Sequence, residues 1–210
     1  MKHRFSAVRQ GLPITLTLWV AAAVAAVFIS GWMGGTIAVV GLLVLLFFRD
    51  PRRTPPQAEG TLLAPVDGRV VDVRCDESAD DGRFHVAVFM SLLNVHVVRV
   101  PCGGTVRSML HVPGGYGHAG APNAALVNEH LVIEIETDNG SVVTMVLVAG
   151  MVARRIVCPI DVGDKLIQGE KIGMIRFGSR VEIETTNTWR AAVAVNDRVR
   201  GGMTVIGETE

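Results

Sequence analysis

The sequence predicts a mainly β domain, a barrel-sandwich of short strands with a few short helices, preceded by an N-terminal transmembrane helical hairpin. Two patterns predict this architecture: an uncharged apolar stretch over residues 10–48, and β-branched segments separated by glycine turns over residues 61–210. Of the 210 residues, 49% are hydrophobic, and 20 basic side chains balance 20 acidic ones. This balance argues against nucleic acid as a partner, because phosphate binding requires a basic excess on one face.

The apolar stretch of 39 residues is too long for a single membrane helix. At ~1.5 Å per residue it would extend about 58 Å, whereas the hydrocarbon core of a bilayer is ~30 Å thick. Small residues at 30–35 divide it into two expected helices, 12–29 and 36–48. Basic residues flank both ends of the stretch: Lys2, Arg4, Arg9, Arg49, Arg52 and Arg53. This distribution predicts an inner (cell) membrane anchor over residues 1–48, spanning or re-entrant, with both ends in the cytoplasm.

A cleaved signal peptide is the alternative for this stretch. Its apolar core would contain only ~7–15 residues and would end at a small-residue cleavage site. The apolar pattern continues instead into a second segment that ends at Phe48. We therefore expect the anchor to be retained.

Residues 49–60 predict a stiff linker, because three prolines prevent a helix from continuing. Beyond it, residues 61–210 should form one domain of short strands. The Asp-Asn-Gly sequence at 138–140 predicts a hairpin turn, and short helices are expected only at 91–94 and 119–128. The expected strands are 68–73, 84–90, 95–100, 105–111, 131–136, 142–148, 152–157, 171–176, 181–183 and 191–195.

Two stretches, 64–71 and 162–173, resemble the strand reversals of biotinyl- and lipoyl-type barrel-sandwich domains. This likeness concerns the fold alone. It suggests an alternative function, a membrane-anchored adaptor or carrier. A carrier requires a lysine at a hairpin tip in a Met-Lys-Met or Asp-Lys-Ala setting, and neither tripeptide occurs.

The dipeptide Gly178–Ser179 is chemically able to cleave itself. The serine hydroxyl can attack the preceding carbonyl to give an ester, and β-elimination then breaks the chain and leaves dehydroalanine, which hydrolyses to a pyruvoyl group. Glycine permits the strained backbone that such an attack requires. In isolation, however, a Gly-Ser pair is usually a simple turn.

Four sequence blocks around this dipeptide resemble the phosphatidylserine decarboxylase family, in its short membrane-anchored form. They occur in the order of that family and extend over most of the soluble chain. The blocks are LAPVDG at 63–68, NVHVVRVP at 94–101, NE at 128–129, and FGS at 177–179 with VARRIV at 152–157 upstream.

The resemblance implies a carboxy-lyase proenzyme that cuts itself between Gly178 and Ser179. The β chain would end at residue 178, and the α chain, 179–210, would remain with it as a heterodimer. Ser179 would become a pyruvoyl cofactor, without pyridoxal phosphate or a metal ion. This group would form a Schiff base with phosphatidylserine and release CO₂ to give phosphatidylethanolamine. The diacyl or ether nature of the lipid, the headgroup contacts and any homo-oligomer stay open.

The resemblance also implies roles for two further residues. His96 would protonate the carbanion that CO₂ loss leaves, a task that suits an imidazole. Asp67 would help to activate Ser179 during cleavage, by orienting a base or accepting a proton. Longer members have a second histidine where this chain has Arg99, which cannot act as a base. Either His96 serves both steps, or another histidine such as His118 substitutes.

Each of these residues also has a purely structural interpretation. Asp67 before a glycine fits a turn, and His96 between valines fits a strand face. Arg154 and Arg155 fit a solvated pair, with a phosphate or carboxylate contact as the alternative. The remaining histidines have no ligand-like spacing, and the three cysteines predict neither a disulfide framework nor a zinc site; these residues are His85, His111, His130, Cys75, Cys102 and Cys158.

Overall fold

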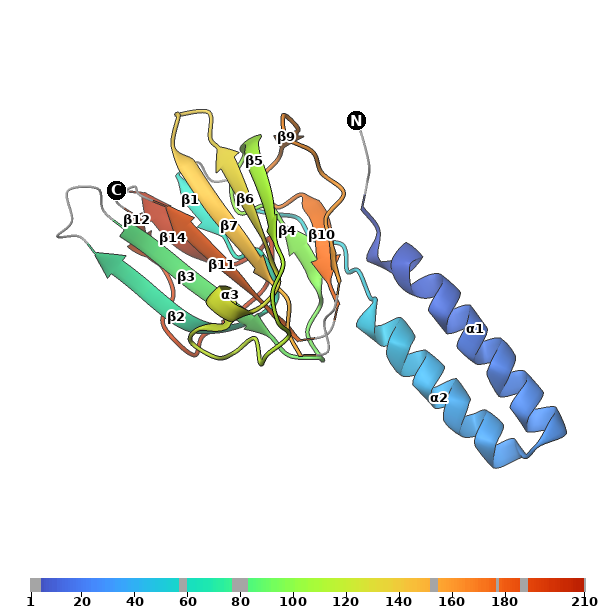
Figure 1. Cartoon of the computed structure of the whole chain (residues 1–210). Helices are drawn as coiled ribbons and strands as arrows, with labels where there is room; N and C mark the ends of the chain where they lie inside the picture. The colour runs from blue at the N-terminus through green and yellow to red at the C-terminus, as the bar shows by residue number, and fades with distance from the viewer. Residues whose placement is uncertain are drawn as a thin grey trace. The chain divides into compact units, whose positions relative to one another are not determined.

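The computed structural model describes residues 5–56, 60–76, 83–151, 155–176, 178–185 and 189–209. Its contacts divide the chain into two compact units, Ser6–Pro51 on the one hand, and Met1–Phe5 with Arg52–Glu210 on the other. The first unit is helical and the second is almost entirely β (Figure 1). The predicted fold class, a mainly β domain with an N-terminal pair of apolar helices, is confirmed.

The helical unit consists of α1 (Ala7–Phe28) and α2 (Gly31–Phe47). The turn between them is shorter than predicted, because Ser30 caps α2: its hydroxyl accepts the Met33 N–H at 3.3 Å, and the glycines that follow are helical. Among the described residues, α1 is the helix long and apolar enough to cross a membrane, with 22 residues and a mean hydropathy of 2.0. The 17 residues of α2 fall slightly short of the ~20 that a span requires.

Small residues allow the two helices to pack closely. A methyl group added at Gly34 would collide with Ala22 and Ala26, and one added at Gly41 would collide with Trp19. Glycines at such contacts let helix backbones approach each other, as is common between membrane helices.

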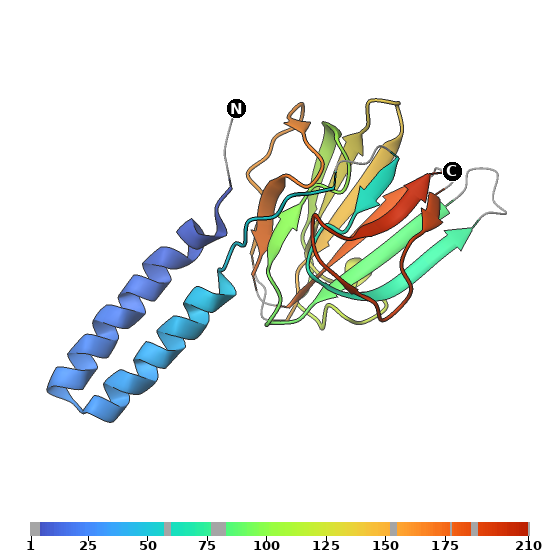
Figure 2. The ribbon, with the colours of Figure 1, turned by 180° about the vertical axis from the view of Figure 1, so that it is seen from behind.

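The β unit contains one long curled sheet and two short sheets (Figures 1 and 2). The long sheet has the order β13-β2-β3-β11-β7-β6-β5-β9, and the short ones have the orders β1-β14-β12 and β4-β10-β8. All the pairs are antiparallel. The strands are β1 (Thr61–Leu63), β2 (Gly68–Asp76), β3 (Arg83–Met90), β4 (Val97–Arg99), β5 (Gly104–Val112), β6 (His130–Glu136), β7 (Val142–Val148), β8 (Ile156–Val157), β9 (Lys165–Leu166), β10 (Lys171–Ile175), β11 (Ser179–Thr185), β12 (Trp189–Ala191), β13 (Arg198–Val199) and β14 (Val205–Thr209).

The core lies inside the curl of the long sheet. Alternate residues of each strand point inward, and in β11 these are Val181 and Ile183, both fully buried. They pack with the inward residues of the neighbouring strands, among them Val86, Val88, Met145 and Leu147. Strand β11 is therefore a central strand, enclosed by β3 on one side and β7 on the other.

Most predicted strands exist, and the hairpin turn at 138–140 joins β6 to β7 as expected. The four strands that were not predicted, β1, β9, β13 and β14, contain two to five residues each. Of the expected strand 152–157, residues 152–154 lie outside the described part of the chain, and β8 covers the end. The expected helix at 91–94 is instead a turn, because the Asn94 side chain accepts the Ser91 N–H and hydroxyl. Within 119–128, only α3 (Ala124–Val127) is helical.

Candidate active site

The Gly178–Ser179 peptide lies where the chain enters β11. Ser179 is the first residue of this strand and pairs with Met90, the last residue of β3. Gly178 has a φ of 63°, in the left-handed region that is readily available only to glycine. The peptide is therefore held at a sharp corner between an irregular segment and a buried strand. Phe177, part of the predicted FGS block, lies outside the described residues.

The carbonyl group of Gly178 packs directly on Gly150. This glycine follows β7, the other neighbour of β11. A methyl group added to Gly150 would overlap the Gly178 carbonyl oxygen, and would also come within 3.2 Å of the Ala119 side chain. The absence of a side chain at residue 150 thus makes the space in which the Gly178 carbonyl sits.

His96 approaches the N–H of Gly178, on the other side of this residue from the Gly178–Ser179 bond, and it comes from the connection between β3 and β4. Its side chain is 1% exposed. The Nδ1 atom lies 2.9 Å from the Asn94 carbonyl oxygen, which can only accept, so Nδ1 carries the hydrogen. Nε2 is then an acceptor, and it receives the Gly178 N–H at 3.3 Å. The imidazole consequently presents an unprotonated nitrogen to the backbone of the candidate cleavage site.

The Ser179 hydroxyl is buried on the inner side of β11. Ser179 has no exposed surface, and its Oγ has no hydrogen-bond partner among the residues that the structure describes. A buried hydroxyl without a partner costs about 1–3 kcal/mol, so native proteins seldom retain one without a reason. An unpaired hydroxyl next to the Gly178 carbonyl is what an attack of Oγ on that carbonyl requires.

Asp67 lies apart from this group. Its carboxylate forms a two-pronged ion pair with Arg53, with 2.7 Å between Nη2 and Oδ2, and it accepts the Gly201 N–H at 2.8 Å. Arg69, Phe89 and Arg180 stand in one row across β2, β3 and β11. Asp67 directly precedes β2, and β3 separates β2 from β11 in the sheet. The structure brings His96 to the Gly178–Ser179 peptide, whereas Asp67 is engaged elsewhere.

Arg99, which replaces the second histidine, also points away from the peptide. It is 4% exposed and donates to the Gly169 carbonyl oxygen at 2.9 Å. Arg99 and Arg53 line a cavity of about 480 Å³, together with Phe5, Pro55, Ile167, Gln168, Gly169, Glu170 and Lys171. His118, the other candidate base, is exposed and stacks on Phe89, with 5.5 Å between the ring centroids.

The segment that contains His118 is fastened beside β11 by side-chain hydrogen bonds. The buried amide of Asn128 donates to the Gly117 and Ala149 carbonyl oxygens at 3.0 and 2.8 Å. Next to it, Glu129 accepts hydrogen bonds from Tyr116 and His111, and these bonds lower the pKa of its carboxyl group. The conformation of this segment therefore depends on the Asn128–Glu129 pair.

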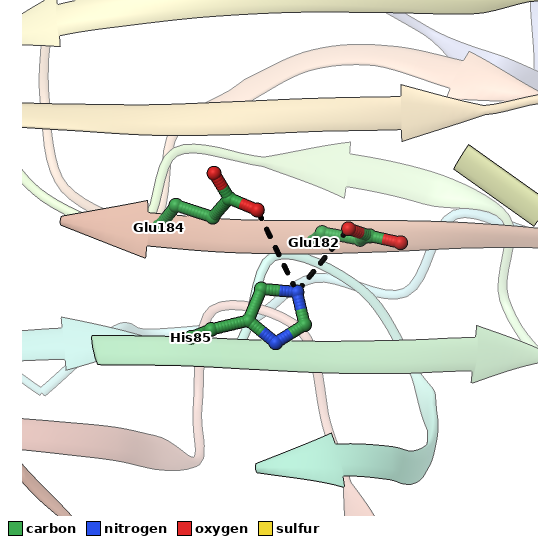
Figure 3. Close-up of side chains that lie close together, drawn as sticks. All are labelled: His85, Glu182 and Glu184. Atoms are coloured by element: carbon green, nitrogen blue, oxygen red, sulfur yellow. Dashed lines mark hydrogen bonds and ion pairs between the residues drawn. The ribbon is translucent and has the colours of Figure 1, made fainter. Parts of the chain in front are cut away.

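An ion-pair network covers the outer face of β11 (Figure 3). The buried Arg180 contacts Glu182 at 2.7 Å and donates to the Ala121 carbonyl oxygen. The other Glu182 oxygen lies 3.2 Å from His85 Nε2, and a Glu184 oxygen lies 3.8 Å from the same nitrogen. These donor atoms fall within 4.8 Å of one another, a spacing that a metal ion can bridge. Because Arg180 already neutralises Glu182, we interpret the cluster as an ion-pair network and not as a metal site.

Comparison with the sequences of known proteins shows which family the chain resembles. The sequence profile of the phosphatidylserine decarboxylase family matches residues 40–207. A phosphatidylserine decarboxylase proenzyme of Nitrosomonas eutropha is 39% identical over 203 residues, 95% of this chain and 94% of the relative. Proenzymes of the same name from Nitratidesulfovibrio vulgaris and Oleidesulfovibrio alaskensis are also 39% identical, over 94% and 98% of this chain and 92% and 95% of their own length.

This chain belongs to the phosphatidylserine decarboxylase family. The resemblance that the four blocks indicated is confirmed, and the protein is a decarboxylase, an enzyme of the lyase class. The alternative of an adaptor or carrier is not supported. Proenzymes in this family are precursors by name, which is consistent with processing of the chain.

Several residues of this candidate site were not singled out from the sequence. Gly150 contacts Gly178 across 28 positions of the chain, and the only local indication is a glycine directly after an apolar strand. Asn94 was recognised as part of a block, but its role in setting the imidazole tautomer depends on a carbonyl orientation. Arg180 follows the predicted serine, and its partners Glu182 and Ala121 are visible only in three dimensions.

Gly150→Ala should accumulate as an uncut chain if the protein is cleaved after Gly178. The added methyl group displaces the Gly178 carbonyl from its position on Gly150. The check is an intact-mass measurement of the purified variant. Gly103→Ala is the matched control, because its added methyl has no neighbour closer than 3.7 Å. Cleavage at the wild-type rate in Gly150→Ala would show that the contact is unimportant.

Glu182→Gln should lower the free energy of unfolding by about 3 kcal/mol, because it leaves the buried Arg180 guanidinium without a counter-charge. Glu184→Gln should change it by less than about 0.5 kcal/mol, since the Glu184 side chain is 53% exposed. Thermal unfolding of the two detergent-solubilised variants provides the comparison, and equal effects would contradict the assigned network.

Proposed function

We propose that this chain is a self-processing phosphatidylserine decarboxylase that cuts itself between Gly178 and Ser179 and converts Ser179 into its pyruvoyl cofactor. One observation carries the proposal. The Gly178 peptide is fixed between His96 and Gly150, and the adjacent Ser179 hydroxyl is buried without a partner among the described residues.

The cleavage proceeds in three steps: an acyl shift, an elimination and a hydrolysis. Ser179 Oγ attacks the Gly178 carbonyl carbon, the peptide C–N bond breaks, and an ester with a free Ser179 amine results. Removal of the Ser179 Cα proton then expels the Gly178 carboxylate and leaves dehydroalanine. Addition of water to its imine form releases ammonia and leaves the pyruvoyl group. The sharp corner at Gly178 and the burial of Ser179 favour the first step, because they fix the carbonyl next to the hydroxyl and exclude competing water.

His96 is the proton donor to the substrate carbanion in this proposal. In the uncut chain its Nε2 is an acceptor next to the peptide, and its Nδ1 proton is fixed by Asn94. The tautomer and the ring orientation are thus set before any reaction, which general acid–base catalysis requires. Asp67 supports the activation of Ser179 by positioning, since its carboxylate is already engaged by Arg53 and by the Gly201 N–H.

The pyruvoyl carbonyl supplies an electron sink that accepts the substrate amine and takes up the electrons left when CO₂ departs. The seryl headgroup of phosphatidylserine provides that amine and carboxylate, and phosphatidylethanolamine is the product. The residues around Ser179 fit this group, because a buried, water-poor position protects a reactive carbonyl from side reactions.

The two chains would remain together after the cut. Residues 179–185 pair along β3 and β7 in the middle of the long sheet. Further along, β13 pairs with β2, and β14 pairs with β1. The strands of the proposed α chain, 179–210, therefore pair with strands of the β chain, and the two chains form a heterodimer. The apolar helices and their basic flanks support an inner-membrane location with the catalytic domain on the cytoplasmic side.

Ser179→Ala tests the cut itself. The wild-type protein should separate under denaturing conditions into residues 1–178 and a fragment of 32 residues that begins with a blocked N-terminus. Ser179→Ala should remain one inactive chain, because alanine has no hydroxyl group that could attack the Gly178 carbonyl. Intact-mass spectrometry decides between them, and decarboxylation by an uncut wild-type chain would overturn the proposal.

His96→Ala tests the proton donor. We expect a chain that still cleaves but turns over ~10²–10⁴ times more slowly, the range that general acid catalysis contributes. A single uncut chain would instead assign His96 to both steps. His118→Ala, its exposed neighbour, should match the wild type. Unchanged cleavage and turnover in His96→Ala would remove His96 from the mechanism.

Asp67→Ala and Arg53→Met together test the role of the carboxylate. We expect Asp67→Ala to stay uncut and Arg53→Met to be cut, since the carboxylate and its hydrogen bond from the Gly201 N–H survive in the second variant. If both variants stay uncut, the ion pair acts only through the fold. The measurement is the fraction of cleaved chain after purification at equal times.

A further inference from the structure

Five large apolar side chains are exposed around the end of the sheet where Gly178 lies. Leu92 and Leu93 are 53% and 84% exposed, Leu126 and Val127 are 87% and 54% exposed, and Met151 is 63% exposed. We call this set the apolar rim. Exposed apolar groups that gather on one part of a surface usually mark a binding face.

The rim comes from three segments, and each one is connected to the candidate cleavage site. Leu92 and Leu93 lie in the connection that leads to His96. Met151 directly follows Gly150, on which the Gly178 carbonyl packs. Leu126 and Val127 belong to α3, just before Asn128, whose amide donates to the Ala149 carbonyl oxygen. Figure 1 shows α3 and the ends of β3 and β7 toward the same end of the sheet.

These side chains contribute little to the core of the domain. Ala124 and Ala125 are the residues of α3 that pack on the sheet, against Val146 and Val148. The turn at 91–94 is closed by polar groups of Ser91 and Asn94, so its conformation does not depend on the two leucines. Leu92 and Leu93 therefore expose apolar surface that the described domain does not bury.

Two arginines lie near the same end. Arg176 is two residues before Gly178, and its N–H donates to the Arg155 carbonyl oxygen at 3.3 Å. Partial burial, together with the charge of Arg155, lowers the pKa of the Arg176 guanidinium. Two cations held close together favour a nearby anion, and guanidinium groups bind phosphate and carboxylate with particular strength.

We propose that the apolar rim is the face with which the catalytic domain enters the surface of an anionic phospholipid bilayer, with Arg155 and Arg176 against the lipid headgroups. This inference rests on the proposed function. A headgroup that reacts at buried Ser179 can stay attached to acyl chains in the bilayer only if the site faces the membrane closely. Apolar tips beside cations bind such interfaces, because the tips enter the acyl boundary and the cations attract anionic lipid.

A site-specific probe tests the docking in the full-length protein. Burial raises the pKa of the Cys102 and Cys158 thiols to about 12, which leaves exposed Cys75 as the reactive native thiol. In a Cys75→Ser background, Leu93→Cys is labelled with an environment-sensitive dye and placed in nanodiscs containing phosphatidylserine. Ile167→Cys is the matched control, since Ile167 is 68% exposed and follows β9, away from the rim in Figure 1.

We expect the dye at residue 93 to be quenched by lipid-attached quenchers and protected from aqueous iodide. The dye at residue 167 should be quenched by iodide and not by the lipid-attached quenchers. Iodide quenching of both sites would overturn the proposal. Protection of residue 93 that appears in detergent and rises with protein concentration would also overturn it, because the rim would then bind a second copy.

A kinetic measurement is independent of the dye. The double variant Leu92→Ser/Leu93→Ser should lower the ratio of kcat/KM on bilayer phosphatidylserine to kcat/KM on a monomeric short-chain phosphatidylserine at least tenfold. The control Val162→Ser/Ile167→Ser should leave the ratio unchanged, and an unchanged ratio in both variants contradicts the docking face. Failure of the wild type on both lipids would instead refute the proposed function, while the dye result would still decide the docking.

Discussion

The contact between the Gly178 carbonyl and the bare backbone of Gly150 is the constraint on which the rest of the site depends. Any side chain at residue 150 would occupy the position of the carbonyl oxygen. The left-handed φ of Gly178 turns the carbonyl toward that space and turns the N–H toward His96 Nε2. Gly178 is thus held through the peptide groups on both of its sides, and the next residue carries the hydroxyl that the proposed cleavage uses.

The sheet supplies this arrangement through the neighbours of one strand. Strand β11 begins with Ser179 and lies between β3, which leads to His96, and β7, which leads to Gly150. A central strand is the least mobile part of a sheet, so both contacts are kept in register. Its outer face carries the buried Arg180–Glu182 pair, which also holds the Ala121 carbonyl beside the site. Strand pairing, burial and the ion pair therefore all position the same peptide.

The sequence predicts those features that depend on local pattern. The length of the uncharged stretch predicts the helix pair, and the β-branched segments predict the sheet. Gly178–Ser179 and the surrounding sequence blocks predict the family. Features that depend on distant contacts could not be predicted. The Arg53 guanidinium reaches Asp67 from the linker side, and no pattern in either segment indicates this pairing. Likewise, α2 begins five residues earlier than expected, because the Ser30 cap outweighs the low helix propensity of the glycines that follow.

The central claim is that Ser179 becomes the carbonyl-bearing N-terminus of a new chain, and reductive amination tests it most directly. Treatment of the purified protein with ammonium and cyanoborohydride converts a pyruvoyl terminus to alanine, which unblocks the chain for stepwise sequencing. The account predicts that the smaller chain then reads Ala-Arg-Val-Glu-Ile, with alanine at the position of Ser179 and the next four residues unchanged. A small chain that begins with serine before treatment, or at any other residue, would contradict the account.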